Sequence, residues 1–222
     1  MKAVLLDFNG TLFFDSGFHL EAWAKIYREL CKTTDNEPGS SFYCGPRNDR
    51  IIQKIAPWLT PEERDFYSQK KERFYRQICL ENPEKVHLVS GAEMLLGYLK
   101  EYRVPFLLAS ASIKENVDFY FSQFGLDRWF DRSQCVYDDG SYADKGEMHL
   151  EAAKRLGVSL SECIVVEDSI SAISHARENG AGIIVGIGTD SVKNDLIHAG
   201  ANRFIHDFTE FQMEWLTAEI PK

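Results

Sequence analysis

Short apolar runs that alternate with helical patterns place the strongest constraint on how this chain folds. The apolar runs are residues 2–7, 104–109, 163–166, 182–186 and 203–206. Helical spacing of apolar residues follows over 91–102, 114–124, 147–156, 169–179 and 191–199, and several of these stretches end at a glycine suited to a C-terminal cap. Strands that alternate with helices of this length form a parallel sheet covered on both faces. The sequence therefore predicts an α/β fold with a doubly wound parallel sheet.

Residues 14–85 have a different pattern. They contain no convincing strand and show amphipathic helical runs at about 17–31, 47–57 and 61–80. Their position directly after the first strand puts them beside the carboxyl edge of the sheet, where ligands bind in open α/β folds. We therefore expect an α/β core of residues 1–13 and 86–222 and a helical cap of residues 14–85. The alternative is a plain helical subdomain with no function of its own.

Composition and charge narrow the possible partners. The chain of 222 residues has 34 acidic and 25 basic residues, a formal net charge of −9, and its basic residues do not cluster. A nucleic-acid backbone would therefore be repelled. No apolar run approaches the roughly 18 residues that cross a bilayer, and the first run is too short for a signal peptide. The five cysteines lack a CxxC pair, which favours a reducing compartment. We expect a cytoplasmic monomer or weak dimer with no membrane partner.

Polar residues follow three of the predicted strands. Asp7 and the Asn9-Gly10-Thr11 turn follow the first, Ser110 to Ser112 follow the second at the start of a helix, and Glu167-Asp168 follow the third. Carboxylates suit Mg²⁺, a helix N-terminus can hold a phosphate, and Lys145 before another helix could neutralise it. Singly, each feature has a plain reading as a turn former, a cap or a solvated charge. Together they indicate phosphoryl chemistry.

The order of these segments resembles the four motifs of the haloacid dehalogenase superfamily of phosphatases and mutases. The motifs are matched by Asp7-Phe8-Asn9-Gly10-Thr11, Leu107-Leu108-Ala109-Ser110, Lys145 and Val166-Glu167-Asp168-Ser169. The insertion after the first motif resembles the helical-cap subclass. His19, Trp23, residues 45–49 and Lys71 have counterparts in its β-phosphoglucomutase-like branch. The resemblance implies a Rossmann-like core, an inserted cap and a phosphatase-type hydrolase.

The resemblance also implies roles for individual residues. Asp7 would attack phosphorus and form an aspartyl-phosphate. Mg²⁺ would be held by the Asp7 carboxylate, the Asn9 main-chain carbonyl and Asp168, with Glu167 behind them. The transferring phosphoryl group would be bound by Ser110, the Ala111 N–H and Lys145. The rest of a small phosphorylated metabolite, such as a sugar phosphate, would meet the cap residues His19, Arg47 and Lys71.

Two positions depart from the family pattern. The family often has Lys-Pro where this chain has Lys145-Gly146. More consequentially, the family's second aspartate, its general acid and base, is Asn9 here, and an amide can serve as neither. Losing such a group typically costs about 10²- to 10⁴-fold in rate, so we expect low or specialised activity.

Four explanations of Asn9 are open. The substrate could have a good leaving group, His19 could supply the proton, the protein could bind without turnover, or the asparagine could be an engineered replacement. We rank a hydrolase first, with a phosphosugar mutase and a catalytically impaired metabolite-binding protein as alternatives.

Overall fold

The computed structural model describes residues 1–33, 35, 37–43 and 47–217 and divides the chain into two compact units. One unit is formed by Met1–Phe14 together with His87–Lys222, and the other by Asp15–Val86. We call them the α/β unit and the helical unit. Among the described residues, no helix is both long enough and apolar enough to cross a membrane.

A six-stranded parallel sheet forms the centre of the α/β unit. Its strand order is β3-β2-β1-β4-β5-β6. The strands are β1 (Ala3–Leu6), β2 (Phe106–Ile113), β3 (Val136–Asp138), β4 (Cys163–Glu167), β5 (Ile183–Ile187) and β6 (Arg203–Ile205). Every residue of β1, β4 and β5 is buried, because helices cover both faces. The predicted doubly wound sheet is confirmed.

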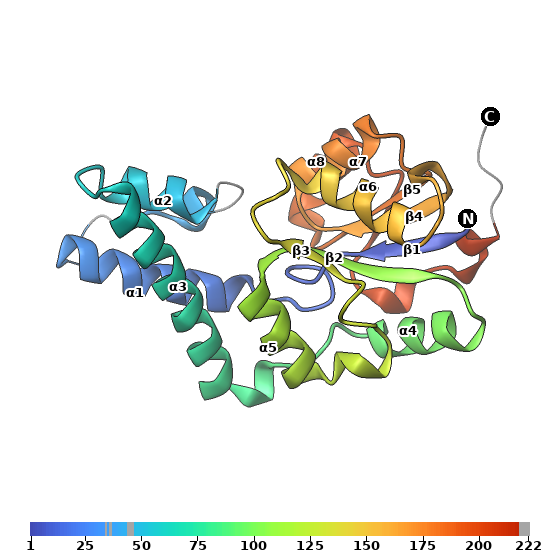
Figure 1. The fold of residues 1–222 in the computed structure, drawn as a ribbon, viewed down its shortest axis with the longest axis horizontal. Helices are drawn as coiled ribbons and strands as arrows, with labels where there is room; N and C mark the ends of the chain where they lie inside the picture. The colour runs from blue at the N-terminus through green and yellow to red at the C-terminus, as the bar shows by residue number, and fades with distance from the viewer. Residues whose placement is uncertain (34, 36, 44–46, 218–222) are drawn as a thin grey trace. The chain divides into compact units, whose positions relative to one another are not determined.

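Five α-helices pack on this sheet. They are α4 (Ala92–Glu101), α5 (Lys114–Phe124), α6 (Lys145–Arg155), α7 (Ile170–Glu178) and α8 (Asp190–Ala199). Figure 1 shows α6, α7 and α8 on one face and α4 and α5 on the other. Small side chains such as Ala152, Ala153 and Ala176 join the core on the α6–α8 face, which lets these helices lie close to the strands.

The second predicted strand is longer than expected, and a third strand was missed. We expected a strand over 104–109, with Ser110 to Ser112 leading into a helix over 114–124. The strand β2 instead continues to Ile113, whereas α5 starts at Lys114 as predicted. The polar residues stay extended because β3 supplies a neighbour: Ser110 pairs with Tyr137, and after a register shift Ile113 pairs with Asp138. Ser110 therefore lies in a strand and does not cap a helix.

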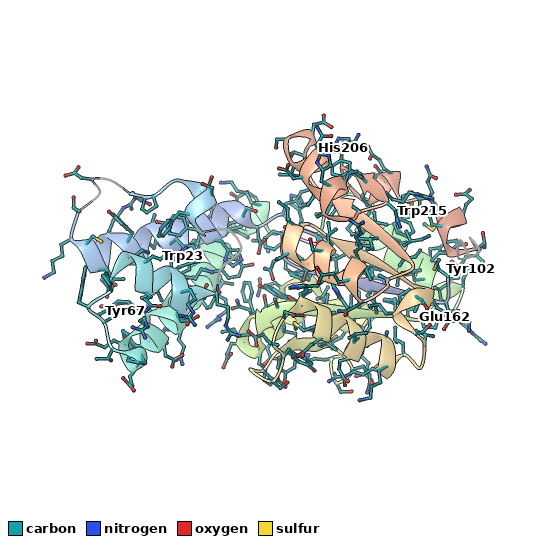
Figure 2. The ribbon with its side chains drawn as sticks, turned by 90° about the horizontal axis from the view of Figure 1, so that it is seen from above. Trp23, Tyr67, Tyr102, Glu162, His206 and Trp215 are labelled. Atoms are coloured by element: carbon teal, nitrogen blue, oxygen red, sulfur yellow. The ribbon has the colours of Figure 1, made fainter. Side chains whose placement is uncertain are left out.

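Three α-helices make up the described part of the helical unit, close to the predicted positions. They are α1 (Ser16–Cys31), α2 (Asn48–Ile55) and α3 (Pro61–Glu81), and α3 begins with a capping box in which Thr60 and Glu63 bond reciprocally. The unit has its own apolar core. Trp23 is 2% exposed within it, and Tyr67 packs against it (Figure 2). Gly45 and Pro46, part of the sequence resemblance, lie outside the described residues.

The departure at Gly146 has a packing reason. A Cβ atom on Gly146 would lie 2.5 Å from Asn179 Nδ2 and 2.9 Å from His175 Cβ, so only a glycine lets the start of α6 approach α7 this closely. Lys145 is the first residue of α6. The close packing therefore helps to fix the position of Lys145 at the start of α6.

We predict that Gly146→Ala lowers the free energy of unfolding by about 1–3 kcal/mol, the usual cost of overpacking. Gly97→Ala is the control, because a Cβ on Gly97, in the middle of α4, meets nothing within 4 Å. It should be neutral or stabilising by roughly 0.5–1 kcal/mol, since alanine favours a helix. Urea unfolding of both variants measures the difference, and equal effects would contradict the packing argument.

Candidate active site

Three acidic side chains meet at the carboxyl edge of the sheet. Asp7 follows β1, Glu167 ends β4 and Asp168 follows it, and one oxygen of each lies within 4.8 Å of the others. β1 and β4 are neighbours in register, with Leu6 opposite Val166, so the residues that follow them are brought side by side. Asp7 is 7% exposed and Glu167 is 1% exposed. Buried acids so close together repel one another unless a cation offsets their charge.

Lys145 supplies one such positive charge. Its Nζ donates a hydrogen bond to Asp7 Oδ1 and lies 3.3 Å from Glu167 Oε1, with the lysine side chain only 9% exposed. Burial alone would lower the pKa of Lys145, but the Asp7 and Glu167 carboxylates raise it above its usual value. The lysine is therefore a fixed cation shared between two carboxylates.

The two carboxylates titrate differently. Burial raises the pKa of Asp7 to about 7, although Lys145 opposes the shift. For Glu167, burial is outweighed by Lys145 and His149, and its pKa is lowered. Glu167 is thus held as a carboxylate, while Asp7 is poised to gain or lose a proton near neutral pH. An added cation at this edge would favour the ionised form of Asp7.

His149 is a site residue that sequence reasoning missed. Its Nε2 lies 2.8 Å from Glu167 Oε1, and its ring is 1% exposed. Its buried Nδ1 has no hydrogen-bond partner within the described part of the chain. An unpartnered nitrogen costs less as an acceptor than as an N–H, so the proton belongs on Nε2, where it is donated to Glu167. The available signal was its spacing of four residues from Lys145 on one helix face.

The Asn9-Gly10 turn lies against the acidic residues. Gly10 has a φ of 71°, and a Cβ there would lie 2.0 Å from Asp168 Oδ2. Only glycine allows both this backbone conformation and this approach. The first and fourth sequence motifs are thus in direct contact.

The Asn9 side chain is held by Ser112 and Tyr120. Its Nδ2 donates to the Tyr120 hydroxyl at 2.7 Å, and the Ser112 hydroxyl donates to its Oδ1 at 2.6 Å. Tyr120 lies on α5 and was not predicted as a site residue, because only the sheet topology brings that helix to position 9.

The predicted phosphate-binding residues lie on β2. Ser110 is fully buried, and its Oγ accepts a hydrogen bond from the Ser112 N–H at 3.3 Å. Ala111 is exposed. Leu108 of β2 pairs with Leu6 of β1, so the segment after Leu108 continues alongside Asp7 at the same edge.

Two of the three residues predicted in the helical insertion contact each other. Lys71 Nζ lies 2.7 Å from His19 Nδ1 and 2.8 Å from Glu72 Oε1, and Lys71 is 3% exposed. Arg47 precedes α2, with 66% of its side chain exposed and its Nε 4.0 Å from Asp49 Oδ1. Lys71 is therefore part of a buried polar cluster of the helical unit, whereas Arg47 is open to solvent.

We predict that Lys145→Met lowers the free energy of unfolding by about 3 kcal/mol at pH 8.5, because it leaves buried carboxylates without their cation. The loss should be smaller at pH 5.5, since Asp7, whose pKa is about 7, is then protonated in the wild type and gains less from Lys145. Chemical denaturation at both pH values measures this. Lys154→Met on the same helix, at a side chain 81% exposed, should cost less than about 1 kcal/mol at either pH. A pH-independent loss for Lys145→Met would contradict the electrostatic account.

Several known proteins are similar to this chain in sequence and in fold. Residues 1–180 match the family model of haloacid dehalogenase-like hydrolases. The crystal structure of an Entamoeba histolytica HAD hydrolase of family IA, variant 3, is 34% identical with a TM-score of 0.90, and the likeness covers 97% of each chain. The Bacillus subtilis protein YhcW, whose name places it with phosphatases, is 30% identical over 189 residues, 83% of each chain. Bacillus subtilis β-phosphoglucomutase is 25% identical over 207 residues, covering 89% of this chain and 88% of that protein. The family resemblance read from the motifs is thereby confirmed, and this chain belongs to the haloacid dehalogenase-like hydrolases.

Proposed function

We propose that the protein is a Mg²⁺-dependent phosphohydrolase that releases phosphate from a small phosphorylated metabolite by way of Asp7. The observation that carries the proposal is the buried Asp7 carboxyl, bonded to Lys145 and grouped with Glu167 and Asp168. This combination supplies a nucleophile, a cation and ligands for a metal at one edge of the sheet. The family membership and the likeness to a phosphatase support the same reaction class.

The donor set fits Mg²⁺. Carboxylate and carbonyl oxygens are the ligands that this hard cation prefers, and Asp7, Asp168 and the main-chain carbonyl of Asn9 could provide them. Glu167, which already contacts Lys145 and His149, would not bind the cation directly but would orient the residues that do. Burial raises the pKa of Asp7 to about 7, and a bound cation would oppose this shift by favouring the ionised carboxylate. When bound, Mg²⁺ would neutralise charge on the phosphoryl oxygens.

The proposed reaction has two steps. In the first, an Asp7 carboxylate oxygen attacks phosphorus, and the leaving group departs with the electron pair of the broken bond. Lys145 holds Asp7 in place and faces the developing negative charge, while the Ser110 hydroxyl and the Ala111 N–H would bind phosphoryl oxygens. In the second, water attacks the aspartyl-phosphate and restores the Asp7 carboxylate. Asn9 can donate no acidic proton in the first step and accept none in the second.

A phosphosugar mutase is the second candidate, and the likeness to β-phosphoglucomutase favours it. A mutase must move a proton from the sugar hydroxyl that receives the phosphoryl group. Asn9 removes the group that would do so. We therefore rank the mutase below the hydrolase, and a protein that only binds its metabolite below both.

We further propose that the helical unit acts as a cap that selects the substrate. It is inserted after β1, where ligands bind in open α/β sheets, and it carries His19, Arg47 and Lys71. The buried Lys71 would shape the cap surface, and the exposed Arg47 would contact the substrate directly.

Asp7→Asn tests the proposed function. It should reduce Mg²⁺-dependent phosphate release from acetyl phosphate to background, because an amide is not a nucleophile for phosphorus. Asp139→Asn, at an exposed position, should keep wild-type activity. Chelation with EDTA should abolish the activity, and Mg²⁺ should restore it. Undiminished turnover by Asp7→Asn would disprove the nucleophile assignment, and binding without turnover in the wild type would favour the binding-only alternative.

Arg47→Ala tests the cap. The variant should raise KM for the physiological substrate while changing phosphate release from acetyl phosphate little, since binding energy remote from phosphorus serves selection and closure. Arg50→Ala is the matched control, because its side chain is 69% exposed and lies near the same Asp49 carboxylate. A screen of sugar phosphates, nucleotides and acyl phosphates identifies the substrate for this assay. Equal effects of Arg47→Ala on every substrate would contradict a role in selection.

A further inference from the structure

We infer that the substrate is an acyl phosphate, a mixed anhydride of a carboxylic acid and phosphate, and not an alkyl phosphate monoester. This inference rests on the proposed function and narrows its substrate class. Its structural basis is a hydrogen-bonded ring that fixes an amide where the family places its proton-transferring carboxyl group.

The ring consists of Asn9, Ser112 and Tyr120. Asn9 Nδ2 donates to the Tyr120 hydroxyl at 2.7 Å, and the Ser112 hydroxyl donates to Asn9 Oδ1 at 2.6 Å. The third side joins Ser112 Oγ and the Tyr120 hydroxyl oxygen at 3.2 Å. Because the Ser112 proton is already given to Asn9, Tyr120 is the donor on this side. Each group thus donates one hydrogen bond around a closed ring, an arrangement in which the bonds reinforce one another.

The ring requires an amide at position 9. A carboxylate has no hydrogen to donate to Tyr120. The Tyr120 hydroxyl would then donate to the carboxylate instead of to Ser112, and the ring of hydrogen bonds would be broken. Asn9 is therefore matched to its surroundings.

Tyr120 fixes the ring to the core of the α/β unit. It is fully buried, and its ring stacks on Phe8 with centroids 4.0 Å apart and planes 14° apart. Phe8 lies between Asp7 and Asn9 in the sequence, so Tyr120 contacts the side chains of two neighbouring residues of this segment, Phe8 and Asn9. The amide is held in a defined orientation and is poorly able to turn aside for another group.

His19 was the alternative source of a proton, and its two nitrogens are engaged within the helical unit. Nδ1 lies 2.7 Å from Lys71 Nζ, and Nε2 lies 3.1 Å from Asp15 Oδ2. An ammonium can only donate, so Nδ1 accepts from Lys71 and the ring proton lies on Nε2, facing Asp15. The imidazole also stacks on Tyr75 with centroids 4.0 Å apart. His19 is thus bound in its own unit's polar cluster.

A substrate suited to this site must release its leaving group without a proton. An alkyl phosphate leaves as an alkoxide, a strong base, whereas an acyl phosphate leaves as a carboxylate, whose acid has a pKa near 4. Asp7 attacks phosphorus, the bond from phosphorus to the acyl oxygen breaks, and that oxygen leaves as the carboxylate of the product. Water then attacks the aspartyl-phosphate, Asp7 regains its carboxylate, and the proton of the water goes to phosphate or solvent. Without a protein base for this second step, phosphorylated Asp7 should accumulate.

Acetyl phosphate and ethyl phosphate form a matched pair, since they are similar in size and differ in the basicity of the leaving group. We expect rapid-quench measurements with Mg²⁺ to show phosphorylation of Asp7 by acetyl phosphate at least about 10²-fold faster than by ethyl phosphate. Asn9→Asp should raise the ethyl phosphate rate by about 10²-fold or more and the acetyl phosphate rate much less. If this variant folds and reacts with acetyl phosphate but leaves the ratio unchanged, the inference fails.

Tyr120→Phe and Ser112→Ala keep the test informative if Asn9→Asp does not fold. Each should lower both rates by a similar factor, because the ring positions Asn9 and supplies no proton. A selective loss of ethyl phosphate turnover in either variant would show that the ring itself donates the proton, and would overturn the inference. Comparable wild-type rates with both compounds would overturn it as well, with the proposed function intact. Failure of both compounds to phosphorylate Asp7 would instead disprove the proposed function.

Discussion

The contact of one buried lysine with two carboxylates organises this molecule. Lys145 bonds to Asp7 and lies 3.3 Å from Glu167, which joins the start of α6 to the ends of β1 and β4. Burying any one of these charges alone would cost free energy, and the pairing with Lys145 reduces the cost of burying the carboxylates. Two features of the α/β unit bring these groups together. The register of β1 and β4 places their carboxyl ends side by side, and Gly146 lets α6 begin close to α7.

This site differs from the family pattern at position 9. Both polar atoms of the Asn9 amide have hydrogen-bond partners, because its Nδ2 donates to Tyr120 and its Oδ1 accepts from Ser112. The surroundings of position 9 therefore suit an amide. In the proposed reaction, phosphoryl transfer to Asp7 needs a nucleophile, a cation and phosphate ligands, all of which are compatible with an amide at position 9. Proton transfer by the residue at position 9 is not compatible with an amide. We therefore propose that the site is limited to substrates whose leaving group departs without a proton.

The sequence predicted the parts of the structure that local patterns encode. Strand β1, the helices of the insertion and the grouping of Asp7 with Glu167-Asp168 follow from apolar periodicity and from the common edge of parallel strands. It could not predict that Ser110 is extended, because a three-residue neighbour, β3, decides this. His149 and Tyr120 were missed for a similar reason: each reads as an ordinary helix residue until tertiary packing sets it against Glu167 or Asn9.

The most direct test of the account is to locate the transferred phosphoryl group. The protein would be mixed with acetyl phosphate and Mg²⁺, quenched in acid within one turnover and digested, and its peptides examined by mass spectrometry with and without hydroxylamine, which cleaves acyl phosphates. We expect one hydroxylamine-sensitive phosphoryl group, on the peptide that contains Asp7. Turnover without a covalent phosphoryl group, or a phosphoryl group on another residue, would contradict it.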